Sequence, residues 1–323
     1  MFGFIFSVGF RPMRVVLVHN PGAGDDSAPG EKELKKLVRD AGHELEYCSV
    51  RGRKWKTALN EDADLVAVAG GDGTVTQVAR HMIERRIPIA VLPLGTANNI
   101  SKSLGVRHLS VEELIASWAS GQRKPFDAGV VSGPWETQHF IEAMGAGLFA
   151  RAMPAADDNA TLENLKDAEA RATYAQQLMR EGLKAHRPMR LDITADGKDL
   201  SGEYILFEAM NMEFVGPNMY LAPDAIGDDG HLDVVLIRES ERRKLDEYLA
   251  TWQQGVTRPP DFTTLKARHL EIEWTGFDVH IDDAVFPDKK KSRPKKPARI
   301  TVDVEPDAVE FLVPTRNDGS TDK

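Results

Sequence analysis

The stretch Leu65-Val-Ala-Val-Ala-Gly70-Gly71-Asp72-Gly73-Thr74-Val75 carries the strongest structural signal in this sequence. Its apolar first half is typical of a strand that is buried on both faces of a parallel sheet. Three glycines follow within four residues, and glycine lets the backbone turn with positive φ while a bulky anion approaches its N–H groups. A helical pattern begins at Val75, and a helix N-terminus adds the positive end of its dipole. We therefore predict a strand–loop–helix unit that binds phosphate; the alternative is a tight turn with Thr74 as the helix N-cap.

The rest of the first 125 residues continues this alternation of strands and helices. Apolar runs predict further strands at 15–18, 45–50 and 87–92, and amphipathic patterns predict helices at 31–41, 75–86 and 98–104. Two more polar loops, Asn20-Pro-Gly-Ala-Gly24 and Pro93-Leu-Gly-Thr-Ala-Asn-Asn99, follow the first and fourth strands. Because the carboxyl ends of parallel strands meet at one edge of a sheet, we expect the three loops to form a nucleotide site there.

After about Asp127 the sequence changes to alternating strand patterns that are joined by Gly, Pro and Asp turns. Strands are predicted at 128–131, 139–144, 189–195, 203–211, 231–237, 269–274, 279–281 and 299–304. The fold class is therefore α/β: an N-terminal doubly wound nucleotide-binding lobe, residues 1–127, and a β-rich antiparallel sandwich, residues 128–306. One helical insert interrupts the second lobe at about 161–186, and residues 315–323 form a flexible polar tail.

Composition narrows the class of protein. The length of 323 residues suits two domains, and 41 Lys and Arg against 50 Asp and Glu leave a formal charge of −9. Nucleic acid is not an expected partner, because phosphate binding needs a positive field. The single cysteine, Cys48, excludes an internal disulfide and indicates a reducing, cytoplasmic compartment. No apolar stretch is long enough to span a membrane, and the apolar residues 1–12 lack signal-peptide features, so we expect Met13 to be the natural start.

A second glycine pattern, Gly145-Ala-Gly147-Leu-Phe-Ala150, fits the loose dinucleotide fingerprint Gly-x-Gly-x-x-Ala. A true fingerprint follows the first strand of a βαβ unit, whereas this one lies in the β-rich half. We therefore reject a nicotinamide or flavin site.

The three polar loops together resemble the catalytic domain of diacylglycerol kinases, a family that includes bacterial soluble lipid kinases and sphingosine and ceramide kinases. The Gly70-Gly-Asp-Gly-Thr74 element is also shared with NAD kinases and phosphofructokinases, and Pro93–Asn99 is what indicates the lipid branch. The resemblance extends through Phe140–Gly147, Asn211, 222–225, 228–233 and 281–283, so it covers the chain from about Met13 to Pro314. It implies that the strand at about 307–314 returns to the first lobe.

The resemblance also implies the chemistry: transfer of the γ-phosphoryl group of ATP to a lipid hydroxyl, with Mg²⁺ to offset charge. Asn20, Gly70, Gly71, Asp72, Gly73 and Thr74 would bind phosphates, and Gly95, Thr96 and Asn98 would complete the nucleotide pocket. Asp72 would orient Mg²⁺ or its waters, with an Asx-type turn as its alternative role. Asp229 matches the carboxylate of a structural Mg²⁺ site, and the alternative for Asp228-Asp229-Gly230 is a turn between strands.

The sequence departs from the family at the expected catalytic base. The family pattern there is Asp-Gly-Glu, and this chain has Asp282-Asp283-Ala284. We predict Asp282 as the base and Asp283 as its substitute. The alternatives are a catalytically weak nucleotide-binding or regulatory protein of the same fold, and an enzyme of the NAD kinase type.

The run Lys289-Lys-Lys-Ser-Arg-Pro-Lys-Lys296 places six cations in eight residues. A lipid kinase must reach a bilayer, and such a run would bind an anionic leaflet at the inner membrane face. The alternative is a solvated hairpin loop. The sequence does not determine the identity of the lipid or the oligomeric state.

Overall fold

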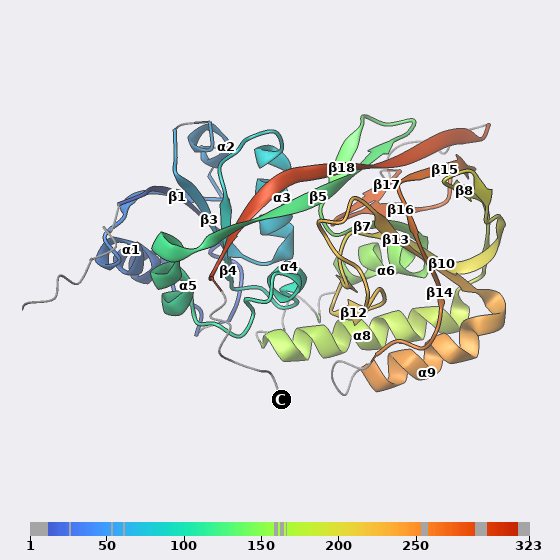
Figure 1. Ribbon diagram of the computed structural model, residues 1–323. Helices are drawn as coiled ribbons and strands as arrows, with labels where there is room; N and C mark the ends of the chain where they lie inside the picture. The colour runs from blue at the N-terminus through green and yellow to red at the C-terminus, as the bar shows by residue number, and fades with distance from the viewer. Residues whose placement is uncertain are drawn as a thin grey trace, which may run out of the picture.

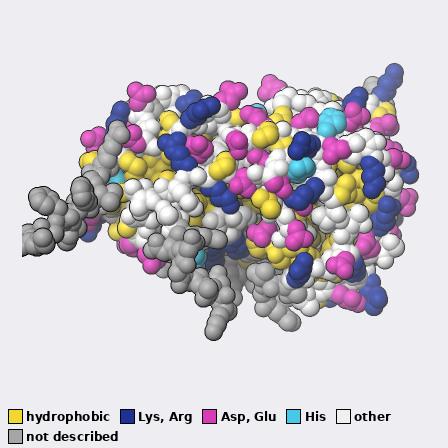
Figure 2. All heavy atoms as spheres, viewed as in Figure 1, with side chains coloured by type: hydrophobic (Ala, Val, Ile, Leu, Met, Phe, Trp, Pro, Cys, Tyr) yellow, Lys and Arg dark blue, Asp and Glu magenta, His cyan; other side chains and the backbone are white. Residues whose placement is uncertain are grey.

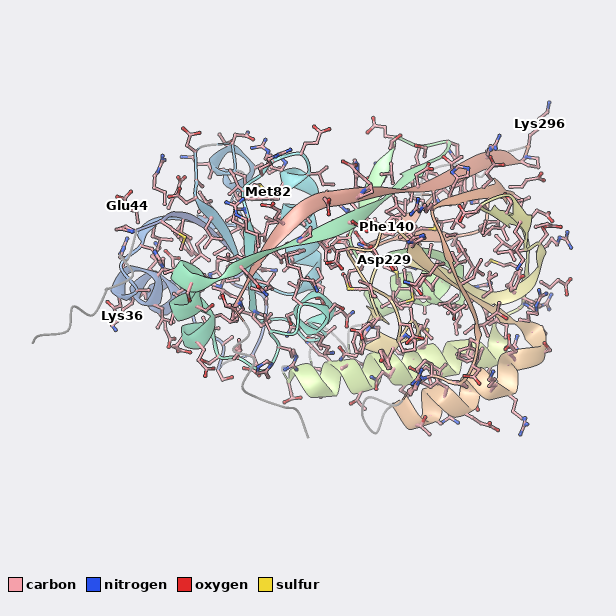
Figure 3. All side chains as sticks on the ribbon, in the orientation of Figure 1. Lys36, Glu44, Met82, Phe140, Asp229 and Lys296 are labelled. Atoms are coloured by element: carbon pink, nitrogen blue, oxygen red, sulfur yellow. The ribbon has the colours of Figure 1, made fainter. Side chains whose placement is uncertain are left out.

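The computed structural model describes residues 12–315 except 26, 53, 61, 158–160, 162–164, 166, 253–257 and 288–295. Two lobes lie side by side, and two long strands run across both of them (Figure 1). Each lobe has its own core, marked in Figure 3 by Met82 in the first lobe and Phe140 in the second, both fully buried. The sequence-based prediction of an α/β lobe and a β-rich lobe is confirmed.

The first lobe contains a parallel sheet in the order β2-β1-β3-β4. Its strands are β1 (Arg14–His19), β2 (Glu44–Ser49), β3 (Leu65–Gly70) and β4 (Ile89–Pro93). Its helices are α1 (Glu31–Asp40), α2 (Trp55–Ala58), α3 (Asp72–Met82), α4 (Asn99–Ser103) and α5 (Val111–Ser117), followed by the 3₁₀ turn η1 (Trp118–Ser120). Every residue of β3 is buried, as expected for a central parallel strand with both faces covered.

Two strands connect the lobes: β5 (Gln122–Ser132) and β18 (Ala298–Val313). They pair antiparallel from Ser132 with Thr301 to Gln122 with Val313. At one end β18 pairs with a strand of the second lobe, and at the other its Phe311 pairs in parallel with Ile89 of β4. The boundary predicted between residues 127 and 128 therefore falls inside β5.

The second lobe is an antiparallel β structure with helices on one side (Figure 1). Its strands are β6 (Gln138–Phe140), β7 (Ala143–Gly147), β8 (Met189–Ala195), β9 (Lys198–Asp199), β10 (Gly202–Met210), β13 (Leu232–Arg238), β14 (Thr263–Ala267), β15 (His269–Trp274), β16 (Val279–Ile281) and β17 (Ala284–Phe286). A separate hairpin consists of β11 (Phe214–Val215) and β12 (Met219–Tyr220). The helices are α6 (Leu148–Asp157), α8 (Ala168–Ala185) and α9 (Arg242–Trp252), the last preceded by the 3₁₀ turn η2 (Glu239–Glu241).

The apolar face of α8 packs inside the second lobe. Met179 and Leu183 of α8 join a core with Leu245 of α9 and with Ile205 of β10. The helical insert therefore covers the sheet of its own lobe, because burying this apolar stripe against the sheet removes it from water.

Three differences from the sequence-based prediction matter for the site. Helix α3 begins at Asp72 and not at Val75, because Gly71 occupies the N-cap position. The sequence analysis did not predict α5, α6 or α9. The strand predicted at 139–144 is divided into β6 and β7, because the backbone N–H groups of 141–143 bind a carboxylate.

Acidic and basic side chains are interspersed over both lobes on the face shown in Figure 2. The basic run 289–296 lies outside the described residues except for Lys296, which Figure 3 labels at the end of the second lobe. Residues 1–11 and 316–323 also lie outside the described residues.

Candidate functional site

Three loops meet at the carboxyl edge of the first-lobe sheet, and hydrogen bonds connect them. The Asn20 backbone N–H donates to the carbonyl of Ala69 at 2.9 Å, and its side-chain Nδ2 donates to Thr74 Oγ1 at 3.1 Å. The Leu94 N–H donates to the carbonyl of Gly70 at 2.9 Å. All of the predicted nucleotide-binding residues lie at this edge, in the loops, at the end of β3 or in the first turn of α3: Asn20, Gly70, Gly71, Asp72, Gly73, Thr74, Gly95, Thr96 and Asn98.

Two of the glycines are required by the close approach of their backbones. A Cβ on Gly95 would lie 2.4 Å from the Cα of Gly71, and a Cβ on Gly71 would lie 3.1 Å from the Cα of Gly95. No side chain fits between the loops that follow β3 and β4. The two glycines therefore allow the two loops to pack backbone against backbone, and no side chain at Gly71 or Gly95 blocks the approach of an anion.

The N-terminus of α3 lies at this edge of the sheet. Gly71 is its N-cap, and no side chain among the described residues caps it, so its first N–H groups remain available. Thr74 is not the N-cap, because its hydroxyl oxygen accepts a hydrogen bond from Asn20 and the helix begins two residues before it. The arrangement of strand, glycine loop and helix N-terminus is suited to binding phosphate.

The loop after β4 is held in shape by its own asparagine. Asn98 has φ 53° in the left-handed region, and its Nδ2 donates to the Gly95 carbonyl at 2.7 Å. The Gly95 N–H in turn donates to Asn98 Oδ1 at 3.0 Å. Asp72 connects this loop to α3, because its Oδ1 accepts the N–H of Ile100 at 3.0 Å. Burial raises the pKa of Asp72.

A cavity of about 270 Å³ lies between the two lobes, beside this edge. One wall is apolar and comes from the second lobe, with Phe149 and Met153 of α6, Met179 of α8 and Val215 of the β11–β12 hairpin. The opposite wall carries four carboxylates: Asp72, Glu142, Asp282 and Asp283. The cavity therefore joins an apolar surface to the Gly70–Thr74 loop.

The Asp282 carboxylate is saturated with hydrogen bonds. Its Oδ2 accepts from Arg80 Nη2 at 2.7 Å and from the Ile141 N–H at 2.9 Å. Its Oδ1 accepts from the N–H groups of Glu142 at 2.9 Å and Ala143 at 3.2 Å. These four donors fill the lone pairs of a side chain that is 0% exposed. This geometry does not support the role of base predicted for Asp282; it makes Asp282 a residue that positions the backbone of 141–143.

Asp283 has a different environment. Its side chain is 47% exposed, and its Oδ1 lies 3.9 Å from Arg80 Nη1. A Cβ on Gly73 would lie 3.6 Å from Asp283 Oδ2, so this carboxylate faces the first turn of α3. Ala284, at the position of the family glutamate, begins β17.

A buried acid–base pair lies behind the carboxylates. His280 Nε2 lies 2.7 Å from Glu208 Oε2, and both side chains are 0% exposed. Burial alone would lower the pKa of His280, but the charge and the hydrogen bond of Glu208 raise it. A Cβ on Gly145 would lie 2.3 Å from Glu208 Oε2, and Gly147 has φ +94°. Packing and backbone conformation therefore account for the glycines of Gly145-Ala-Gly147.

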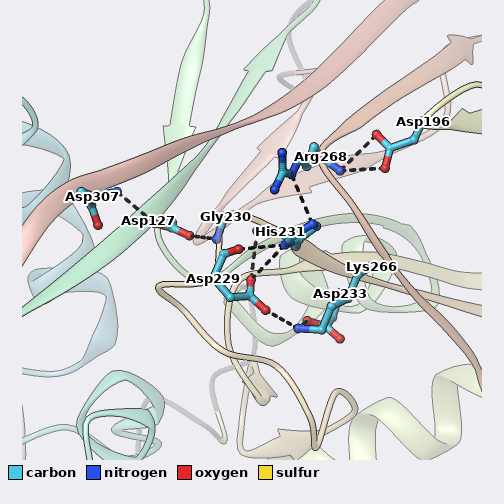
Figure 4. Close-up of polar contacts among 9 residues, drawn as sticks. All are labelled: Asp127, Asp196, Asp229, Gly230, His231, Asp233, Lys266, Arg268 and Asp307. Atoms are coloured by element: carbon cyan, nitrogen blue, oxygen red, sulfur yellow. Dashed lines mark hydrogen bonds and ion pairs between the residues drawn. The ribbon is translucent and has the colours of Figure 1, made fainter.

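Asp229, the predicted ligand of a structural Mg²⁺, pairs with a lysine instead (Figure 4). Lys266 Nζ donates to Asp229 Oδ2 and lies 3.5 Å from Asp233 Oδ2. The second oxygen of Asp229 accepts the N–H of His231 at 3.0 Å. The Lys266 ammonium group pairs with both carboxylates and takes the place of a cation beside them, so the residues present do not fit a divalent cation at this position.

The adjoining turn is fixed by Asp127 of β5 (Figure 4). Its Oδ2 accepts the N–H of Gly230 at 2.7 Å, and its Oδ1 accepts the N–H of Asp307 at 2.9 Å. Asp127 therefore links the turn at 228–230 to both strands that cross the lobes, in agreement with the alternative of a structural turn.

Sequence reasoning did not identify several residues of this site: Arg80, Asn99, Glu142, Glu208 and His280. Arg80 was detectable as the single Lys or Arg of α3, and Glu142 as an acid within the predicted strand 139–144. The pairing of His280 with Glu208 joins residues 72 positions apart, and the sequence carries no signal for it.

The fold and the site together define a class of two-lobed proteins in which a glycine-rich loop after a parallel strand adjoins a cavity of a β-rich second lobe. Residues 14–131 match the model of the diacylglycerol kinase catalytic domain. Residues 143–313, more than half of the chain, match the model of the YegS C-terminal NAD kinase beta sandwich-like domain. The chain therefore belongs to the family of diacylglycerol kinases and YegS-like lipid kinases.

Individual relatives agree with this assignment. The chain is 29% identical over 237 residues to a diacylglycerol kinase of Bacillus subtilis, covering 70% of this chain and 74% of the relative. It is 24% identical over 263 residues to a probable lipid kinase YegS-like of Shewanella frigidimarina, covering 80% and 79%. A crystal structure of a diacylglycerol kinase from Bacillus anthracis superposes with a TM-score of 0.70 at 22% identity, over 93% of this chain and 96% of that one, which shows the shared fold.

Among the described residues, no helix combines the length and the apolar character needed to cross a membrane.

Proposed function

We propose that this protein is an ATP-dependent lipid kinase that transfers the γ-phosphoryl group of ATP to the hydroxyl of a diacylglycerol-like lipid. The observation that carries this proposal is the cavity between the lobes. It has an apolar wall on one side and Asp72 of the Gly70–Thr74 loop on the other. A lipid acceptor needs both surfaces, because its chains must leave water while its hydroxyl reaches the phosphate.

The phosphates of ATP would bind at the N-terminus of α3. There the N–H groups of the Gly70–Thr74 loop and the helix dipole stabilise negative charge. Gly95 and Asn98 shape the adjoining loop, and Asn20 ties the first loop to Thr74. These hydrogen bonds fix the conformation of the loops before the nucleotide binds, which reduces the loss of backbone and side-chain entropy on binding.

A divalent cation such as Mg²⁺ would neutralise charge on the β- and γ-phosphates when bound. Asp72 is the residue suited to hold it or its waters, since its carboxylate oxygens are the ligands that hard cations prefer. The Asp72 side chain lines the cavity next to the phosphate loop. Its Oδ1 is oriented by the N–H of Ile100, which fixes the direction of the carboxylate.

The size of the cavity fits only part of a lipid. Small-molecule sites are commonly about 300–1,000 Å³, so about 270 Å³ is enough for the reacting head and the first methylenes of a chain. The rest of the lipid would stay in the bilayer, and we propose that the run 289–296 helps the protein to bind there. The protein would then work as a peripheral enzyme on the inner membrane face.

The test is a transfer assay. Purified protein receives labelled ATP, Mg²⁺, NAD and mixed vesicles that contain diacylglycerol, and the label is then partitioned between organic and aqueous phases. We expect label in the organic phase. Label in NADP would support an enzyme of the NAD kinase type, and ATP binding without any transfer would support a catalytically weak nucleotide-binding protein; both results would refute the proposal.

A further inference from the structure

Glu142 lies in the two-residue connection between β6 and β7, on the carboxylate wall of the cavity. The family pattern would place a glutamate at Ala284, where this chain has none. A kinase that acts on an alcohol still needs a group that accepts the hydroxyl proton. The question is which of the four cavity carboxylates is available for that task.

Three of the four carboxylates are less suited to it. Asp72 stands in the first turn of α3, on the phosphate side, with Oδ1 bound to a backbone N–H. Asp282 accepts four hydrogen bonds and has no free lone pair. Asp283 is half-exposed to solvent and faces the first turn of α3, with Arg80 3.9 Å away.

The backbone of Glu142 is held by two hydrogen bonds, whereas its side chain accepts a single long one. Its N–H donates to Asp282 Oδ1 at 2.9 Å, and its carbonyl accepts the N–H of Asn211 at 2.9 Å. The side-chain oxygen Oε2 accepts one long hydrogen bond, 3.3 Å, from Asn99 Nδ2. A rigid backbone therefore presents a carboxylate with unused lone pairs to the cavity, which is the arrangement that a base requires.

Asn99 orients the Glu142 side chain. Asn99 is buried, and the same Nδ2 also donates to the carbonyl of Gly216 in the β11–β12 hairpin at 2.8 Å. Gly216 lines the cavity as well. The amide of Asn99, at the start of α4 in the first lobe, thus links the Glu142 side chain to the hairpin that forms part of the apolar wall.

We propose that Glu142 is the catalytic residue that accepts the proton of the lipid hydroxyl, and that Asp282 positions it. This inference rests on the proposed function. As the hydroxyl oxygen forms its bond to the γ-phosphorus, its proton passes to the Glu142 carboxylate and the bond between the γ-phosphorus and the β–γ bridging oxygen breaks. ADP leaves with the electron pair of that bond, and Glu142 then releases the proton to solvent.

The electrostatic environment agrees with this role. Burial first, and then the negative charges of Asp72 and Asp282, raise the pKa of Glu142 well above its ordinary value. A carboxylate with a raised pKa is a stronger base than one in water, and catalysis improves as the pKa of the base approaches the working pH.

The experiment compares Glu142→Gln with the wild-type protein in the transfer assay on diacylglycerol vesicles. We expect kcat to fall roughly 10²- to 10⁴-fold, the usual effect of losing a positioned base. KM for the lipid and the Kd for ATP should stay unchanged, because the amide keeps the shape of the side chain. Tm should not fall, because the amide removes a negative charge that burial and neighbouring carboxylates disfavour. Glu213→Gln is the matched control, since Glu213 is half-buried in the 211–221 segment and lies outside the cavity lining; its kcat should equal that of the wild type.

A shorter side chain provides a second test that does not depend on the glutamine variant. Glu142→Asp keeps the charge but withdraws the carboxylate by one methylene, and a misplacement of about 1 Å can cost about 10²-fold in rate. We expect a kcat between those of the wild type and Glu142→Gln, again with unchanged KM.

Several outcomes would overturn the inference. Wild-type kcat in Glu142→Gln would do so, as would a loss that appears in ATP affinity or Tm and not in kcat. Full activity of Glu142→Asp, or a kcat that collapses in Asp283→Asn but not in Glu142→Gln, would assign the proton to another group. If the wild-type protein labels no lipid at all, the proposed function itself fails, and this result is distinct from the others.

Discussion

Replacing Asp282 by asparagine should destabilise the protein through the contacts around the connection between β6 and β7. The carboxylate accepts one hydrogen bond from Arg80 and three from consecutive backbone N–H groups, all between 2.7 and 3.2 Å. Asparagine keeps one accepting oxygen and turns the other atom into a donor, so two of the four donors lose their acceptor.

The expected loss is large because the site is dry. Each buried donor without a partner costs about 1–3 kcal/mol, and removing one partner of a buried ion pair costs about 3–5 kcal/mol in total. For a unit of this size, a loss of about 4 kcal/mol lowers Tm by roughly 10 °C. Urea unfolding followed by tryptophan fluorescence measures the change directly.

Asp283→Asn is the matched control for this measurement. The Asp283 side chain is 47% exposed, and its Oδ1 is as far as 3.9 Å from Arg80 Nη1, so losing this charge should cost at most about 1 kcal/mol of stability. Equal unfolding midpoints for the two variants would refute the reasoning, because they would show that the four contacts of Asp282 contribute nothing beyond a surface charge.

Four further outcomes are expected. Gly95→Ala should lower ATP affinity roughly tenfold or more in calorimetric titration, because the added Cβ would lie 2.4 Å from the Cα of Gly71. In the control Gly30→Ala the added Cβ meets no atom within 4 Å, so ATP affinity should stay that of the wild type. Burial lowers the pKa of His186 below 6.5, so the neutral imidazole contributes its full stability above pH 6.5 and loses it as the pH falls towards the folded-state pKa. The urea midpoint of the wild type should therefore drop between pH 7.5 and 5.5, and the drop should be smaller in His186→Gln. Without nucleotide, the Tm of the wild-type protein should be the same in EDTA and in Mg²⁺. Lys266→Met leaves Asp229 and Asp233 without their cation, so this variant should have a lower Tm that Mg²⁺ or Ca²⁺ restores. Vesicle co-sedimentation should show binding to anionic vesicles that weakens with salt and disappears when the six cations of 289–296 are replaced by serine, and an unchanged result in that variant would contradict membrane docking by this run.

Much of the architecture was readable from the sequence. The apolar run at 65–69, followed by three glycines, predicts the central strand and the loop at its end, and both lie where expected. The change from continuous to alternating apolar patterns near Asp127 predicts the change from a parallel to an antiparallel sheet. These features depend on contacts between near neighbours in the chain and on which faces are buried, and periodicity records both.

The roles within the site depended on tertiary structure. The sequence analysis predicted Asp282 and Asp283 as the candidate bases and placed Glu142 inside the predicted strand 139–144. Only the folded chain brings Asp282 against the backbone N–H groups of 141–143, which are some 140 residues away in the sequence. That contact saturates one carboxylate, interrupts the strand and presents another carboxylate to the cavity. Likewise, the sequence predicts Asp229 to be a metal ligand, and only the tertiary structure places Lys266 beside its carboxylate. The charge state and the free lone pairs of a carboxylate are set by its neighbours in space, and the sequence of a β-rich lobe does not specify which distant strands supply those neighbours.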